Sequence, residues 1–435
     1  MRRSLSGFEK AFCLSEPLVP INFSLVACFA SKPDETALRL ALSRLHERYS
    51  MAALRLDHAE NGEPFFTDAG VPDFPLWVTE HTPDGDWQQV TARELGKNFD
   101  LANGPLIRTV LLKQSANSGA DLVLTFHHGI ADGMSAFYFL RDLLSLLHDP
   151  QADLPVMTQL PDLLGLIPEK AKRSLSLKVQ TVGMKSGLWL MRHFPPLERV
   201  FPSADRLING RPPWQHFGLT SCCLTQAQTT RLLSLCKERG TSIHAAICTA
   251  WLLARSGTNP GIKNWKRSIS SPVNLRGMLN AENTFGMCMS STVVSVDCNP
   301  NRDFWDIARE IKIRINQDIQ TGRVYRWTLT MIGLMDSSSG AMRRAIPTFS
   351  TQPVHYDFSI SNLGKLSLPA RNDSLTVDAV YGPIVNTSEQ EITVGVSTVC
   401  DQLTMTLTYR DFVLDPVEAK KMTEKVVEIL GKAAG

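Results

Sequence analysis

The stretch His127-His128-Gly129-Ile130-Ala131-Asp132-Gly133 is the most informative part of this 435-residue chain. It follows an apolar run, residues 122–126, that has the length and composition of a buried β-strand. It precedes residues 135–147, in which apolar side chains recur at helical spacing. The heptapeptide is therefore predicted to form a turn between a strand and a helix, where a rigid scaffold can hold reactive side chains in place.

The residue types in the heptapeptide suit proton transfer. An imidazole with a pKa of about 6.5 is an effective proton acceptor near neutral pH. Two other interpretations must be weighed: a surface loop with incidental histidines, and a metal site, because His127, His128 and Asp132 are all potential ligands. Adjacent strand residues point to opposite faces, so the two imidazoles do not converge easily on one ion. We therefore expect no metal.

The pattern His-His-x-x-x-Asp-Gly resembles the signature of the acyltransferase superfamily that includes chloramphenicol acetyltransferase, nonribosomal condensation domains and polyketide-associated acyltransferases. The resemblance implies that His128 is the catalytic base and that His127 is its packing or orienting neighbour. It implies that Asp132 is structural and pairs with an arginine from the other half of the chain, for which Arg276 is the candidate. Gly133 leaves room for the backbone turn and for substrate.

Three further segments extend the resemblance. Residues 99–108 resemble the FDLxxGPLxR segment of condensation-type domains, and residues 240–245 resemble the start of the buried helix of the second domain. Residues 357–364 resemble the SNxG strand of polyketide-associated acyltransferases and alcohol O-acetyltransferases. Alternation places Ser359 and Ser361 on one face of that strand, where they would stabilise an oxyanion or line a tunnel. The alternative is that both serines face solvent or are satisfied in the core.

The alternation of strand and helix patterns in both halves predicts an α/β protein with α+β two-layer halves. The resemblance implies two chloramphenicol-acetyltransferase-like domains in a V-shaped pseudo-dimer, with the active site at the seam. We expect an N-terminal domain over residues 1–160, a crossover over 161–215 and a C-terminal domain over 216–435. Within the crossover, residues 169–192 read as a cationic amphipathic helix. That helix would contact a membrane surface, dock an acidic carrier protein, or pack on the seam.

Composition excludes some classes of function. A net charge of +2 gives no case for nucleic acid binding. The nine cysteines are scattered without zinc-type pairs, which favours reduced thiols and a cytoplasmic location. No secretory leader and no uninterrupted run of about 18 apolar residues is found, so a membrane-spanning helix is not expected.

The sequence therefore predicts an acyltransferase that moves an acyl group from a thioester to a hydroxyl of a lipid or secondary-metabolite acceptor. We expect no tightly bound cofactor; acyl-CoA or acyl-phosphopantetheine is the co-substrate, and the donor arrives in trans. Where condensation domains carry a GxFxNT-like run, this chain has Phe285-Gly286-Met287-Cys288-Met289-Ser290, which favours ester over amide formation. The alternatives are a free-standing condensation domain that forms an amide, and a catalytically silent carrier-docking module. A monomer is expected.

Overall fold

The computed structural model describes residues 2–17, 19–81, 86–114, 119–155, 157–173, 182, 207–256, 265–335, 354–369, 375–386 and 388–435. The first half contains these elements: β1 (Arg2–Ser4), α1 (Gly7–Ser15), β2 (Asn22–Phe29), α2 (Glu35–Arg48), β3 (Arg55–His58), β4 (Pro64–Thr67), β5 (Leu76–Glu80), α3 (Trp87–Leu95), β6 (Ile107–Lys113), β7 (Ala120–His127), α4 (Gly133–His148), β8 (Thr158–Gln159), α5 (Leu163–Leu166) and α6 (Glu169–Lys172).

The second half repeats the mixture of strands and helices. Its elements are the short 3-10 helix η2 (Pro213–Gln215), β9 (Phe217–Leu224), α8 (Gln226–Glu238), α9 (Ile243–Ser256), β10 (Lys266–Asn274), α10 (Arg276–Leu279), β11 (Thr284–Phe285), β12 (Met289–Asp297), α11 (Phe304–Gln320), η3 (Arg323–Tyr325), α12 (Arg326–Met335), β13 (Phe358–Lys365), β14 (Val377–Val385), β15 (Thr393–Val399), β16 (Gln402–Arg410) and α14 (Pro416–Ala434).

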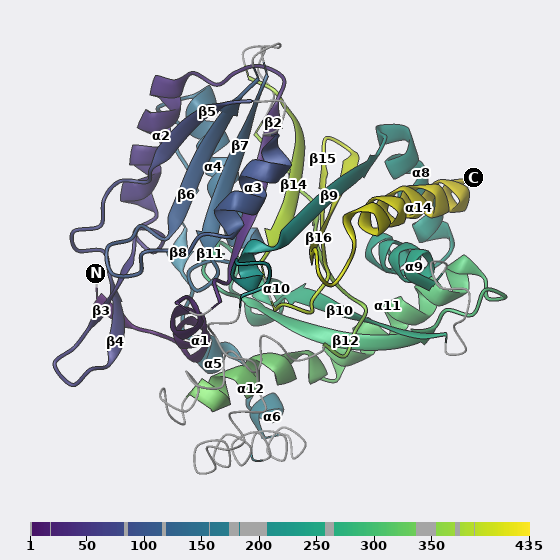
Figure 1. Cartoon of the computed structure of the whole chain (residues 1–435). Helices are drawn as coiled ribbons and strands as arrows, with labels where there is room; N and C mark the ends of the chain where they lie inside the picture. The colour runs from purple at the N-terminus through teal and green to yellow at the C-terminus, as the bar shows by residue number, and fades with distance from the viewer. Residues whose placement is uncertain are drawn as a thin grey trace.

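Two large sheets organise these elements (Figure 1). The N-terminal sheet has five strands in the order β14-β2-β7-β6-β5, and the C-terminal sheet has six in the order β12-β10-β13-β15-β16-β9. Helices α2 and α4 share the core of the first sheet, while α8, α9, α11 and α14 cover the second. This arrangement confirms the predicted fold class, a mixed α/β chain with two lobes.

One strand does not lie in the sheet of its own half. Strand β14 comes from the C-terminal half but pairs antiparallel with β2, at the edge of the N-terminal sheet. A second, shorter pairing joins β8 to β11 in parallel. The chain therefore crosses between the lobes at more than one place. The predicted domain boundaries at 160 and 215 stay a prediction.

The heptapeptide occupies the predicted turn. Strand β7 ends at His127, and α4 begins at Gly133 with Asp132 as its N-cap. Every residue of β7 is buried, because the strand lies between β2 and β6 and is covered on both faces. The site is thus attached to the most protected strand of the N-terminal sheet.

The predicted helix over residues 169–192 is described over α6, which ends at Lys172; its other residues lie almost entirely outside the described part of the chain. Among the helices that the structure describes, none has the length and apolar run needed to span a bilayer. All nine cysteines have free thiols.

Candidate active site

His128 is held by two hydrogen bonds at the end of β7. Its backbone N–H donates to the Ile21 carbonyl at 3.1 Å, and its ring Nδ1 lies 3.0 Å from the Ala131 carbonyl oxygen. A carbonyl oxygen only accepts, so the ring proton sits on Nδ1. The Nε2 of neutral His128 therefore keeps a free lone pair, which is the form that a general base requires.

Aromatic rings enclose the His128 imidazole. Phe12 of α1 stacks on it with ring centroids 5.3 Å apart and an interplanar angle of 9°, and Phe23 of β2 lies 4.8 Å away at a tilt. Burial lowers the pKa of His128, against the Asp132 charge and the Ala131 carbonyl, which act to raise it. The imidazole is therefore neutral, and able to accept a proton, at neutral pH.

His127 points into the protein and has a different environment. Its Nδ1 accepts a hydrogen bond from the Gly129 N–H at 3.0 Å, and its Nε2 lies 3.6 Å from Glu16 Oε2. Burial lowers the pKa of His127 to about 3 and raises that of Glu16 to about 7. At most pH values between these two pKa values, the His127 imidazole and the Glu16 carboxyl are therefore both uncharged. This geometry fits the packing role predicted for His127.

Asp132 and Arg276 form a buried, two-point ion pair. Arg276 Nη1 donates to Asp132 Oδ2 at 2.7 Å, and Nη2 donates to Oδ1 at 3.0 Å. Burial opposes the ionisation of Asp132, but the Arg276 charge and the hydrogen bonds outweigh it and hold the pKa of Asp132 below its usual range. The structure therefore brings together the two residues whose pairing was predicted from opposite halves of the chain.

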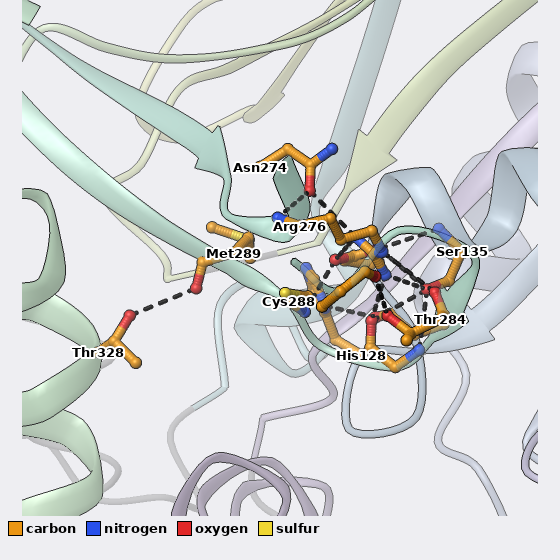
Figure 2. Close-up of polar contacts among 12 residues, drawn as sticks. His128, Ser135, Asn274, Arg276, Thr284, Cys288, Met289 and Thr328 are labelled. Atoms are coloured by element: carbon orange, nitrogen blue, oxygen red, sulfur yellow. Dashed lines mark hydrogen bonds and ion pairs between the residues drawn. The ribbon is translucent and has the colours of Figure 1, made fainter. Parts of the chain in front are cut away.

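Several neighbours complete this pair (Figure 2). Arg276 Nη2 also donates to Ser135 Oγ at 2.8 Å and to the Gly286 carbonyl at 2.9 Å, and Nε donates to the Thr284 carbonyl at 3.1 Å. The Cys288 N–H donates to Asp132 Oδ2 at 2.9 Å. We call Asp132, Ser135, Arg276, Gly286 and Cys288 the interlobe lock. It fixes the start of α4, and hence the loop carrying His128, to the C-terminal half.

Gly133 lies where a side chain does not fit freely. A Cβ on this residue would come within 2.7 Å of Leu363 Cδ2 and 3.5 Å of Pro383. Leu363 belongs to β13, the strand predicted from its SNxG resemblance, so glycine lets β13 approach the start of α4. A register shift between Asn362 and Lys365 interrupts the pairing of β13 with β15.

The two serines of β13 are less well connected to the site. Ser359 is buried and Ser361 is half-buried, and in the described residues neither makes a hydrogen bond to His128. Their predicted role toward an oxyanion stays a prediction. Among the described residues, no group of three or more His, Cys, Asp or Glu side chains could hold a metal ion.

Some residues at the site were not predicted from the sequence. Phe12 lies in α1 and Glu16 is the residue that caps the end of this helix, both far from the heptapeptide in sequence. No local pattern indicates that they contact it. Ser135 could have been found, because its N–H donates to Asp132 Oδ1 at 2.9 Å, as an N-cap three residues upstream allows. The Gly286 and Cys288 backbone contacts carry no side-chain signal at all.

The two lobes give the chain the chloramphenicol-acetyltransferase-like fold that the sequence resemblance implied. Two family models match: the condensation domain over residues 20–158, and the phthiocerol/phthiodiolone dimycocerosyl transferase C-terminus over residues 213–408. These matches confirm the recognition of the HHxxxDG acyltransferase superfamily, with a condensation-type first half and an acyltransferase-type second half. They point to a transferase of the acyl-transfer or condensation type.

Individual relatives agree with this placement. Phosphinothricin tripeptide synthetase PhsC from Streptomyces viridochromogenes is 26% identical over 315 residues, which cover 68% of this chain and 27% of the synthetase. The chain spans between 4% and 27% of the length of the curated relatives that it matches. The likeness therefore concerns one part of much longer proteins.

Solved structures show the same fold. A trichothecene 15-O-acetyltransferase from Fusarium sporotrichioides superposes with a TM-score of 0.69 at 13% identity, covering 99% of this chain and 95% of that one. The first condensation domain of the calcium-dependent antibiotic synthetase gives a TM-score of 0.69 at 16% identity, covering 100% and 96%. At such identities the likeness shows the fold alone.

Proposed function

We propose that this chain is an O-acyltransferase that moves an acyl group from a thioester, acyl-CoA, to a hydroxyl of a lipid or secondary-metabolite acceptor. The observation that carries the proposal is the orientation of His128, whose Nδ1 bonds the Ala131 carbonyl and leaves Nε2 free as a base. A general base removes the proton of the acceptor hydroxyl, and His128 is oriented for this step. No tightly bound cofactor takes part.

The chemistry follows from this geometry. His128 Nε2 takes the proton of the acceptor hydroxyl while the oxygen attacks the thioester carbonyl carbon. A tetrahedral intermediate forms, its carbon–sulfur bond breaks, and the imidazolium returns the proton to the departing thiolate. The interlobe lock holds the loop of His128 in place, which supplies the fixed orientation that such a reaction needs.

Ester formation is favoured over amide formation by two observations. The match over residues 213–408 is to an acyltransferase rather than to a condensation domain. The run 285–290 departs from a GxFxNT-like segment, because Cys288 and Ser290 stand where that segment has Phe and Asn. It contributes to the interlobe lock through backbone atoms of Gly286 and Cys288.

A second candidate is amide formation from carrier-bound substrates with an acyl-phosphopantetheine donor. The match of residues 20–158 to the condensation domain and the similarity to a tripeptide synthetase favour it. In both candidates the donor is a thioester. A monomeric state and a cytoplasmic location belong to the same proposal as the ester-forming activity.

A thiol-release assay on the purified protein tests the proposal. Acyl-CoA donors and carrier-protein thioesters are offered against pooled alcohols and pooled amines, and the products are identified by mass. Alcohol-dependent release of CoA with an ester product is the expected result. An amide product supports the second candidate, and silence with every donor indicates a docking module that has lost catalysis.

A further inference from the structure

The imidazole of His127 supports the loop that carries the proposed base. Its Nδ1 accepts a hydrogen bond from the Gly129 N–H at 3.0 Å, and a Cβ on Gly129 would lie 2.8 Å from the same nitrogen. The ring therefore packs directly against the backbone of the residue that follows His128. Because an accepting Nδ1 carries no proton, the proton of the neutral ring is on Nε2. His127 and His128 thus hold opposite tautomers in adjacent positions.

The Nε2–H of His127 faces the carboxyl group of Glu16. Nε2 lies 3.6 Å from Glu16 Oε2, and the two side chains are 0% and 2% exposed. In the part of the chain that the structure describes, neither atom has a hydrogen-bond partner. An unpaired buried donor or acceptor costs about 1–3 kcal/mol, so closure of this contact would stabilise both groups. A separation of 3.6 Å is too long for a hydrogen bond, but hydrogen bonds at active sites are often long without substrate and tighten when it binds.

Glu16 is held in place by groups other than His127. Its Oε1 accepts a hydrogen bond from the Phe99 N–H, and its backbone carbonyl accepts one from the Asn98 side chain. Its backbone N–H donates to the Phe12 carbonyl at 3.1 Å, at the end of α1. One oxygen of the carboxyl group is therefore fixed, which leaves Oε2 beside the imidazole. Glu16 thus connects the end of α1 and the segment of Asn98 and Phe99 to the ring that supports the loop.

Burial keeps this pair neutral near neutral pH. It lowers the pKa of His127 to about 3, so the ring is uncharged and only its tautomer can change. It raises the pKa of Glu16 to about 7, against the Phe99 N–H and the Arg108 charge, which act to lower it. A carboxyl group accepts a hydrogen bond in its protonated form and in its ionised form. The contact of Glu16 with His127 therefore does not depend on which form is present.

We propose that Glu16 is a positioning residue whose Oε2 accepts the Nε2–H of His127. Nδ1 of this ring then stays an acceptor for the Gly129 N–H, and the loop that carries His128 keeps one orientation. This role rests on the proposed function, in which His128 is the base. Glu16 acts through the His127 ring rather than on substrate, and it affects turnover because the reaction needs a base in a fixed orientation.

The tautomer of His127 tests this role without catalysis. Glu16→Gln keeps one oxygen for the Phe99 N–H but turns an NH2 group toward His127, so two donors face each other. Nitrogen-15 NMR of the histidine rings distinguishes the two tautomers. We expect the proton of wild-type His127 to be on Nε2, and we expect Glu16→Gln to move it to Nδ1 in part or in full.

Two spectra would overturn the proposal. One is a wild-type spectrum in which the proton of His127 is on Nδ1, and this spectrum is decisive even if Glu16→Gln does not fold. The other is a His127 signal that is identical in the wild type and in Glu16→Gln.

Turnover is then compared with that of a matched control on the same helix. Glu9→Gln makes the same chemical change in the first turn of α1, where Gln also serves in the capping box. Glu16→Gln is expected to lower kcat about tenfold to a hundredfold with KM near that of the wild type. Glu9→Gln is expected to leave both parameters unchanged. Equal kcat values for the two variants would overturn the positioning role.

The two measurements separate this role from the proposed function. A wild-type protein that is inactive with every thioester donor would contradict the proposed function, and a changed tautomer in Glu16→Gln would still support the contact between Glu16 and His127. A lowered kcat with an unchanged His127 tautomer would overturn the positioning role and leave the proposed function standing.

Discussion

At position 128, one hydrogen bond decides which ring nitrogen can act as a base. The Ala131 carbonyl fixes the proton on Nδ1 and leaves Nε2 available, and burial among aromatic rings favours the neutral form. The roles of His128 and Asp132 were predicted through the resemblance, because both residues lie within one short motif. Phe12 and Glu16 were not predicted, since their contacts join segments that are distant in the sequence.

The lowered pKa of His128 predicts the pH dependence of the reaction. A base must be neutral, and a pKa below 6.5 keeps the imidazole neutral to more acidic pH. We expect kcat/KM to be constant at neutral pH and to fall on the acidic side with a midpoint below 6.5. A profile of kcat/KM against pH measures this midpoint. An acidic limb centred clearly above that value would contradict the assigned environment of His128.

The Asp132–Arg276 pair predicts a large loss of stability on truncation. Arg276→Ala leaves a buried carboxylate without its partner, and breaking a buried pair in this way costs about 3–5 kcal/mol. The pKa of Asp132 is lowered by folding, so its contribution is present above pH 3.8 and is lost as the pH falls further. Urea unfolding at neutral pH measures the effect.

Arg314→Ala is the matched control, because Arg314 pairs with Glu310 on the exposed face of α11. It is expected to change the free energy of unfolding by no more than about 0.5 kcal/mol. Equal urea midpoints for Arg276→Ala and the wild type would show that the interlobe lock does not stabilise the fold.

At the scale of elements, the sequence predicted strands and helices with strong periodicity and missed those with weak signals. Helix α4 was predicted within two residues of its observed bounds. Helix α3 was not, because its core contribution includes only two apolar residues, Val90 and Leu95. Helix α1 carries a recognisable signal, the capping box between Ser6 and Glu9, that the sequence interpretation did not use.

The contact between Phe12 of α1 and His128 leads to a second prediction about the pKa of His128. Phe12→Ala removes the ring that covers one face of the imidazole and admits water there. Because burial lowers the pKa of His128, we expect the acidic limb of the pH–rate profile to move toward 6.5. The shift is measured against wild type under the same conditions. An unmoved or more acidic limb would show that Phe12 does not control the environment of His128.

At the scale of the whole molecule, two connections hold the lobes together: the interlobe lock and strand β14. Beyond its pairing with β2, β14 packs against the C-terminal sheet, where Ser397 Oγ and Thr404 Oγ1 each donate to the Val380 carbonyl at 2.6 Å. The sequence does not indicate which sheet β14 joins, because the apolar pattern of this strand suits either one. Which sheet a strand joins depends on long-range pairing that a single sequence does not contain.

The close approach of β14 and β15 predicts that Gly395 is sensitive to substitution. A Cβ on Gly395 would overlap the Pro383 carbonyl oxygen, which belongs to the backbone and cannot rotate away. Gly395→Ala is expected to destabilise the protein by about 1–3 kcal/mol or more through overpacking. Thermal unfolding measures this change.

Gly431→Ala provides the control, because Gly431 lies in α14 with open space around its missing Cβ. Alanine favours the helix, so this variant is expected to gain about 0.5–1 kcal/mol. Equal effects of the two substitutions would mean that β14 does not approach the C-terminal sheet as closely as the structure shows.

The central claim is that His128 accepts the acceptor's proton during acyl transfer. The most direct test compares wild-type turnover with that of His128→Ala, using a donor and acceptor that the wild type converts. The account predicts a loss of about a hundredfold to ten-thousandfold in turnover. Near-wild-type turnover by His128→Ala would contradict the account and require a different base.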